Sequence, residues 1–139
     1  MITEKVKSKE ELVGRLESSD FDNFRSNLCH YLKNCGDLDF MYSIIISDVI
    51  TLFYEKQMYK EALYTLAALD YVSKENEIPI CTRYEQLRHL KFEKPIFPKQ
   101  TEMVCRLMHN DSFKEKLLKK ANPEFLKYNI VEGDMRDVC

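Results

Sequence analysis

Glycine and proline are scarce in this chain: three glycines and four prolines occur among 139 residues. Both residues interrupt regular structure, so their scarcity, together with long periodic runs, favours helices. Three glycines are also too few for a loop that cradles phosphates, and the sequence has no G-x-G-x-x-G, Walker or G-x-S-x-G pattern. The chain therefore lacks the standard motifs of nucleotide-binding enzymes and of serine hydrolases.

No apolar run is long enough to span a bilayer, because the longest one, around MYSIIISDVITLFY, contains Ser47 and Asp48. The N-terminal stretch has no apolar segment of the kind found in signal peptides. The five cysteines are scattered, and none forms a C-x-x-C pair or has the spacing of a zinc finger. We therefore expect a cytoplasmic protein with free thiols, without a metal, a cofactor or a membrane contact.

Charge of one sign is also lacking over the whole chain, whose net charge is -2. Residues 83–128 contain eleven bases and six acids, whereas residues 1–82 contain nine bases and fourteen acids. A chain so close to neutral has no overall field that attracts nucleic acid. We interpret the lysines of residues 112–120 as the solvated face of a helix, and contact between residues 112–128 and nucleic acid is a weaker alternative.

Helical periodicity predicts an all-α fold, a bundle of five to seven helices in a single domain over residues 1–139. The expected helices cover residues 8–18, 20–34, 38–57, 59–75, 82–90, 101–110 and 112–120, with a last turn from Asn122-Pro123. Asp37 is the expected N-cap of the third helix. A short turn joins residues 38–57 to 59–75, which predicts a central antiparallel hairpin over about 38–75. Two prolines exclude regular structure from residues 91–99.

Arg25 and His30 form an Arg-x4-His pair, which is also the motif of the small helical HEPN-type ribonucleases. On a helix with about 100° per residue, the two side chains point about 140° apart, and His30 points away from the apolar face. We therefore expect a solvated helix face and no catalytic residues. A HEPN-like ribonuclease that uses Arg25 and His30 is the alternative function.

Asp70 falls on the apolar face of the expected helix 59–75, close to the direction of Leu63. A carboxylate in such a place must pair, accept hydrogen bonds or stay protonated. We predict a buried bond to a tyrosine, an arginine or a helix end. A general acid or base is the alternative, although the sequence names no partner for it.

The second half of the chain is similar to the C-terminal part of a loosely defined bacterial all-helical family. The similarity covers about residues 62–137 and rests on the stretches LAALDYVSKENEIPI, FEKPIFP and ANPEFLKYNIVEGDMRDV. Family members have a loop like EPWFP and an ending like P-x-F-R-R-R-N-I-F-V. The residues that match these two patterns are Pro95, Phe97, Pro98, Pro123, Phe125, Asn129, Ile130 and Val131.

The chain departs from this family at several positions. Ile96 stands where the family tends to have tryptophan, and Leu126 and Tyr128 replace arginines, which puts an anion-binding role of those arginines in doubt. Members of the family are encoded beside nucleotidyltransferase-like toxins as their antitoxin partners. The resemblance therefore implies a binding role and no catalytic residues.

Aromatic residues are interleaved with basic residues over positions 84–128. Most of these rings are expected to anchor irregular loops to the core. We nevertheless expect an apolar patch near Ile96, Phe97, Phe125 and Tyr128 to bind one protein partner or a second copy of the chain. The function expected from the sequence is thus a non-catalytic protein-interaction module, such as an antitoxin or a regulator.

Overall fold

The computed structural model describes residues 9–18 and 20–138. Its regular elements are α-helices and short 3₁₀ turns, which confirms the expected all-α class. The α-helices are α1 (Lys9–Leu16), α2 (Phe21–Cys35), α3 (Asp37–Ser47), α4 (Val49–Glu55), α5 (Tyr59–Glu75), α6 (Lys99–Met108), α7 (Ser112–Lys119) and α8 (Pro123–Leu126). Short 3₁₀ turns lie at Thr82–Tyr84, Leu87–His89 and Met135–Asp137. Ser8, where the first helix was expected to begin, lies outside the described residues.

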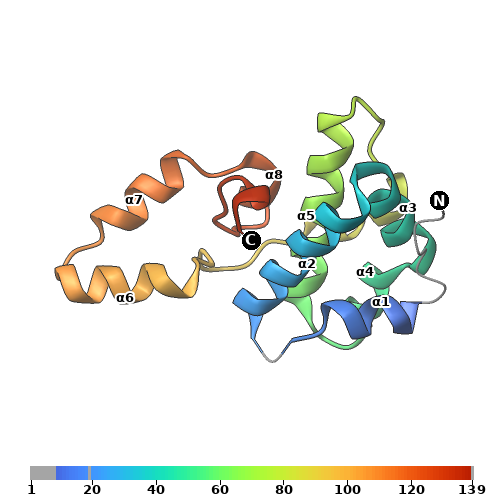
Figure 1. The fold of residues 1–139 in the computed structure, drawn as a ribbon. Coiled ribbons are helices and arrows are strands. Elements are labelled where there is room, and N and C mark those ends of the chain that lie inside the picture. Colours follow the sequence, from blue (N-terminus) through green and yellow to red (C-terminus); the bar gives the residue numbers. More distant parts are fainter. Residues whose placement is uncertain (1–8, 19, 139) are drawn as a thin grey trace.

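Helix α5 is the centre of the core, and the other core helices pack around it (Figure 1). All residues from Ala62 to Asp70 are buried, so this helix is enclosed on every side. Helices α2, α3, α4 and α8 contact it directly. Each fully buried leucine or phenylalanine stabilises the fold by about 2 kcal/mol, which explains why apolar residues dominate this helix. The predicted antiparallel hairpin of residues 38–75 is present as α3, α4 and α5.

The expected single helix over residues 38–57 is wrong, because the chain breaks at Asp48 into α3 and α4. Asp48 has the left-handed conformation, with φ 54° and ψ 40°. Aspartate tolerates this conformation better than most residues, since its short side chain can bond locally. Its Oδ1 accepts hydrogen bonds from the hydroxyls of Thr51 and Tyr84, at 2.8 and 2.7 Å. The apolar periodicity continues through the break and therefore hides it.

Two further boundaries differ from the sequence predictions. Gly36, with φ 83°, ends α2 and is the N-cap of α3, so Asp37 is the first residue of that helix rather than its cap. A positive φ suits glycine, which has no Cβ. The expected short helix over 82–90 is instead two 3₁₀ turns. By contrast, Asn122 caps α8 as predicted and accepts a hydrogen bond from the backbone N–H of Glu124.

The loop before α6 is irregular through Pro98, as its prolines predict, although α6 begins at Lys99 rather than at the expected residue 101. The loop pairs with the C-terminal tail. Ile96 forms a parallel bridge with Ile130. The Ile96 N–H donates to Asn129, and the Val131 N–H donates to Ile96, both at 2.9 Å. Ile130 and Val131 are buried, so the tail docks on the core. This pairing joins the segment that enters α6 to the segment that follows α8.

Helices α6 and α7 form a hairpin that projects from the core (Figure 1). We call residues 99–120 the arm. It contacts the rest of the chain near its base, where Lys114 Nζ lies 5.2 Å from the centre of the Phe97 ring. Just beyond the arm, the Asn122 N–H donates to the Glu132 carbonyl at 2.6 Å. The base is thus fixed to the tail, while the arm itself extends away from the core.

Replacing Tyr128 with phenylalanine is expected to raise the free energy of unfolding by about 1 kcal/mol. The Tyr128 ring is fully buried, and its hydroxyl finds no hydrogen-bond partner among the described residues. Burial also raises the pKa of this hydroxyl. Urea unfolding tests the change. Tyr64→Phe is the control, because it removes a hydroxyl that is bonded to Glu132. A loss of stability in Tyr128→Phe as large as in the control would contradict this description.

Candidate interaction surface

Helix α6 exposes several large apolar side chains, of which Met103 and Leu107 share one side, and it buries smaller side chains on another side. Thr101 and Cys105 lie one turn apart and are buried. Met103, Leu107 and Met108 are between 53% and 73% exposed. These residues are good helix formers, and α6 packs on α7 within the arm. Thr101 and Cys105 are therefore covered by neighbouring residues, whereas the large apolar side chains of α6 are left exposed to solvent.

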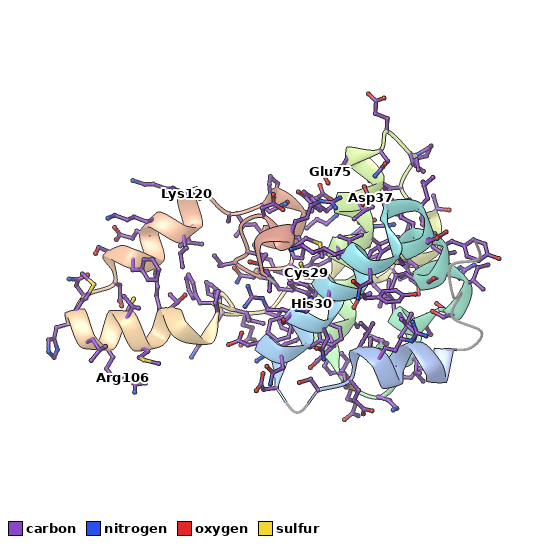
Figure 2. All side chains as sticks on the ribbon, viewed as in Figure 1. Cys29, His30, Asp37, Glu75, Arg106 and Lys120 are labelled. Carbon is purple, nitrogen blue, oxygen red and sulfur yellow. The ribbon has the colours of Figure 1, made fainter. Side chains whose placement is uncertain are left out.

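Helix α7 and its C-cap add positive charge to the arm. Its Leu118 is also partly exposed, and Lys116, Lys119 and Lys120 are exposed. Figure 2 shows the side chains of Arg106 and Lys120 extending from the two helices of the arm into solvent. The arm contains six basic and three acidic residues, which gives it a net charge of +3. The net charge of the whole chain is -2, so the residues outside the arm have a net charge of -5.

Exposed apolar side chains gathered on one short element are typical of surfaces that bind another protein. The arm is one-sixth of the chain, yet it contains four of its large exposed apolar residues: Met103, Leu107, Met108 and Leu118. Single exposed apolar residues scattered over a surface are normal, but here three of the four lie on one helix, α6. The arm is therefore the candidate interaction surface.

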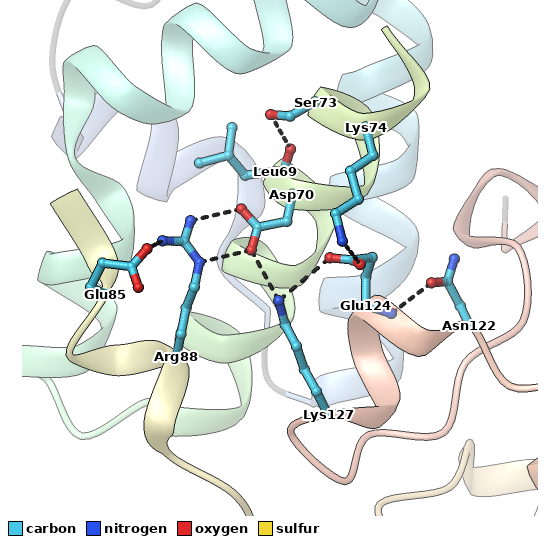
Figure 3. A network of polar contacts seen from close by, with 9 residues as sticks. All are labelled: Leu69, Asp70, Ser73, Lys74, Glu85, Arg88, Asn122, Glu124 and Lys127. Carbon is cyan, nitrogen blue, oxygen red and sulfur yellow. Dashed lines mark hydrogen bonds and ion pairs between the residues drawn. The ribbon is translucent and has the colours of Figure 1, made fainter. Parts of the chain in front are cut away.

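A cluster of charged side chains around buried Asp70 joins α5, the Leu87–His89 turn and α8 (Figure 3). The Asp70 carboxylate is fully buried in α5, and Arg88 donates to it twice, from Nε at 2.9 Å and from Nη2 at 2.8 Å. Lys127 Nζ reaches the same carboxylate at 3.3 Å. Burial alone would lower the pKa of Arg88, but the bond and charge of Asp70 raise it. This pairing confirms the predicted buried bond of Asp70.

The Asp70 cluster also includes α8. Lys127 Nζ contacts Glu124 at 3.4 Å, and Lys74 of α5 donates to the other oxygen of the same carboxylate. Glu85 pairs with Arg88 from the loop side at 2.6 Å. The cluster therefore joins α5, the 3₁₀ turn Leu87–His89 and α8 through their charged side chains. Its members are engaged with each other, so it fits a structural role better than acid–base chemistry.

A second buried carboxylate, Glu132, fixes the tail against α2 and α5. Arg25 donates to its Oε2 from Nε at 2.8 Å and from Nη2 at 2.6 Å, and the Tyr64 hydroxyl donates to the same atom at 2.9 Å. Although burial alone would lower the pKa of Arg25, the charge of Glu132 raises it. Burial and the same charge raise the pKa of Tyr64. Because Glu132 follows α8 closely, this cluster also steadies the base of the arm.

Arg25 and His30 do not meet in the structure. Both lie on the unbroken helix α2. His30 is exposed, as expected, but the expected solvated face is wrong for Arg25, which is largely buried against Glu132. The third nitrogen of Arg25, Nη1, pairs with Asp22 at 3.2 Å. Arg25 lines a depression of about 480 Å³ between α2 and the tail, but carboxylates already accept from all three of its nitrogens. A phosphate there would have to displace a carboxylate, so the arrangement is that of a structural arginine.

The apolar patch predicted for partner binding is divided by the structure. Phe125 and Tyr128 are fully buried, so they serve the core and cannot contact a partner of the folded chain. Ile96 and Phe97 are half-buried at the base of the arm. Binding of a partner through Ile96 and Phe97 stays a prediction. The burial of Phe125 and Tyr128, with that of Tyr84, agrees with the expected anchoring of irregular segments by aromatic rings.

The cysteines and charged clusters complete the inventory of possible chemistry. Cys35, Cys81 and Cys105 are free, whereas Cys29 is disulfide-bonded, contrary to the expected free thiol. Burial raises the pKa of Cys35 to about 11, which makes it a poor nucleophile. Among the side chains that the structure describes, no group of His, Cys, Asp and Glu could hold a metal ion. None of the described helices is long and apolar enough to cross a membrane.

Sequence reasoning missed the exposed face of α6. Five apolar residues occur at positions 103, 104, 105, 107 and 108, and a helix cannot turn all five toward one neighbour. That excess was the available signal for an exposed face.

Comparison with protein-family models, with curated proteins and with solved structures gives no match.

Proposed function

We propose that this chain is a cytoplasmic, non-catalytic protein-interaction module that binds one protein partner through its arm. The observation that carries the proposal is the exposure of Met103, Leu107 and Met108 on a hairpin that projects from the core. Amphipathic helices bind partners by laying such a face into an apolar groove. The free thiols of Cys35, Cys81 and Cys105 fit a place in the cytoplasm, whereas the disulfide of Cys29 does not support one.

The charge of the arm narrows the chemistry of its partner. Lys116, Lys119 and Lys120 are exposed at the end of α7, and the arm as a whole is positive. A matching surface is an apolar groove edged by carboxylates, since complementary charges steer association and disfavour wrong partners. The resemblance of residues 62–137 to a family of antitoxin partners favours an antitoxin or regulator as the specific form of this proposal.

The buried clusters support a binding role for the arm by fixing its base. The backbone on both sides of the arm is fixed, at Ile96 by its bridge to Ile130 and at Asn122 by its bond to Glu132. Glu132 and Asp70 in turn are bonded to core helices. A fixed base presents the arm in one orientation, which lowers the entropy lost on binding.

Photocrosslinking in the source cell tests where the partner binds. A photoreactive amino acid is placed at Leu107 on the arm, and at His30, an exposed position on α2, as the matched control. We expect one specific adduct from position 107 and none from position 30. Adducts from position 30 alone, or from neither position, would contradict the proposal.

Direct binding then shows whether the captured protein depends on the arm. The purified partner is titrated with the wild type and with Leu107→Glu/Met108→Glu, which places two charges on the apolar face. We expect the arm variant to lose at least about a hundredfold in affinity, equivalent to about 3 kcal/mol. The control is Tyr54→Glu/Leu90→Glu, which adds the same charges at exposed apolar positions outside the arm. Equal binding by the arm variant and the wild type would refute the proposal.

A further inference from the structure

A depression outside the arm is lined almost wholly by apolar side chains. It lies where the end of α4, the start of α5 and the segment after the Leu87–His89 turn come together, and its volume is about 280 Å³. We call it the α4–α5 pocket, and it is lined by Tyr54, Tyr59, Leu63, Leu90, Lys91 and Phe92. Apolar depressions with a few polar groups are the usual sites for small molecules. None of the lining residues belongs to the arm, so this pocket is separate from the proposed partner surface.

The walls of the α4–α5 pocket are held in place by the fold. The rings of Tyr54 and Tyr59 meet edge to face, with their centres 5.3 Å apart and their planes at 67°. Leu63 is part of the buried core. The Asn129 side chain donates to the Phe92 carbonyl at 2.9 Å, which ties the loop side of the pocket to the tail. A pocket that exists before binding needs little reorganisation when a ligand enters it.

The polar side chains that line the pocket can donate hydrogen bonds, and none of them is acidic. Lys91 is exposed, and its ammonium has no carboxylate partner among the described residues. The hydroxyls of Tyr54 and Tyr59 have no hydrogen-bond partner in that part of the chain either. Glu55 and Glu93 are the nearest acids along the chain, and neither lines the pocket. The charge of the lining is therefore positive, which is complementary to an anion.

We infer that the α4–α5 pocket binds a small aromatic carboxylic acid in its ionised form. The ring of the acid lies among Tyr54, Tyr59 and Phe92, since aromatic rings favour edge-to-face and offset contacts. The carboxylate accepts a hydrogen bond from the Lys91 ammonium, and such charge-assisted bonds are stronger than neutral ones. A volume of 280 Å³ equals about nine water molecules, which is room for one ring with a short chain. A peptide segment of several residues does not fit, so the ligand is a free acid.

Titration of the full chain with hydrocinnamate, one ring on a short carboxylate chain, tests the inference by calorimetry or by amide chemical shifts. A ligand of this size should bind with a Kd of about 0.1 mM. Hydrocinnamamide has the same shape without the charge, so it should bind about fivefold more weakly, as expected for a partly exposed ion pair. Phenylpropylamine has the opposite charge and should bind most weakly of the three. Amide shifts should change in the α4–α5 turn and around Lys91, and not in the arm.

Two lysine variants test whether Lys91 recognises the carboxylate. Lys91→Met keeps a long side chain but removes the charge, and because the residue is exposed the fold should not change. We expect this variant to bind hydrocinnamate about fivefold more weakly and hydrocinnamamide as well as the wild type does. Lys94→Met is the matched control, since Lys94 is an exposed lysine outside the pocket, and it should leave both affinities unchanged.

The other outcomes overturn the inference in distinct ways. Equal binding of the acid and the amide by the wild type would show that the pocket does not recognise charge. Tighter binding of the amine, or no binding of the acid at millimolar concentration, would also refute it. A loss of affinity in Lys94→Met as large as in Lys91→Met would place the acid elsewhere on the surface.

The pocket and the arm are tested independently. Leu107→Glu/Met108→Glu should bind hydrocinnamate as the wild type does, although it loses the partner. Tyr54→Glu/Leu90→Glu places two carboxylates at the pocket, so it should lose hydrocinnamate and keep the partner. Loss of hydrocinnamate in the arm variant would contradict the assignment of the acid to this pocket.

Discussion

Replacing Arg88 with methionine is expected to lower the free energy of unfolding by about 3–5 kcal/mol, the usual loss when one member of a buried ion pair is removed. Asp70 is fully buried, and Arg88 makes two of the hydrogen bonds to its carboxylate. Lys127 would remain, at 3.3 Å, so we expect a loss near the lower limit. Methionine fills much of the space of the arginine stem, which limits the effect to the lost charge and bonds. Urea unfolding gives the difference.

A double variant separates this electrostatic cause from a general loss of packing. Asp70→Asn/Arg88→Met removes the buried charge together with its partner, so it should be more stable than Arg88→Met alone. Arg88→Lys keeps the charge but cannot donate in the same forked geometry, and its loss should be intermediate. If the double variant is the least stable of the three, the Asp70 cluster is held by packing rather than by the ion pair.

Replacing Arg25 with methionine is expected to cost about 3 kcal/mol for the same physical reason. Arg25 donates twice to Glu132, whose side chain is nearly buried, and the substitution leaves that carboxylate with the Tyr64 hydroxyl and the Gly133 N–H. The freed tail would also loosen at Asn122, because the backbone of Glu132 holds that residue. Thermal or urea unfolding measures the loss of stability.

His30 provides the matched control for this second prediction, since it lies on the same helix and is exposed. His30→Ala should change the free energy of unfolding by no more than about 0.5 kcal/mol, as most surface substitutions do. Equal effects of the two substitutions would contradict the structural role assigned to Arg25. They would also reopen the alternative in which the Arg-x4-His pair acts as one unit.

Local sequence signals predicted most of the helices because their causes are local. Gly36 marked the end of α2, and Asn122-Pro123 marked the start of α8, since a positive φ and a cap depend on the residues themselves. The position of Asp70 on an apolar face predicted a buried partner, because a buried carboxylate requires one. Its partner, Arg88, is eighteen residues away, and only the folded chain brings the two together.

The missed features depend on contacts between distant segments. Asp48 interrupts the helix expected over residues 38–57, and its carboxylate bonds both to Thr51 within the run and to Tyr84 outside it. The contact with Tyr84 cannot be seen in the run itself. Phe125 and Tyr128 have the composition of a binding patch, yet both are buried, because the tail folds back on α5. The exposed face of α6 was hidden in the same way, since periodicity shows that a helix has an apolar face but not whether a neighbour covers it.

Hydrogen exchange of the complex with the captured partner is the most direct test of the claim that the arm is the binding element. Backbone amides of α6 and α7 should exchange freely in the unbound chain, where the hairpin projects into solvent, and slow down when the partner binds. Amides on the exposed side of α2, around His30, should be unaffected. Slower exchange in the core helices, with the arm unchanged, would show that the partner binds elsewhere and would contradict the account.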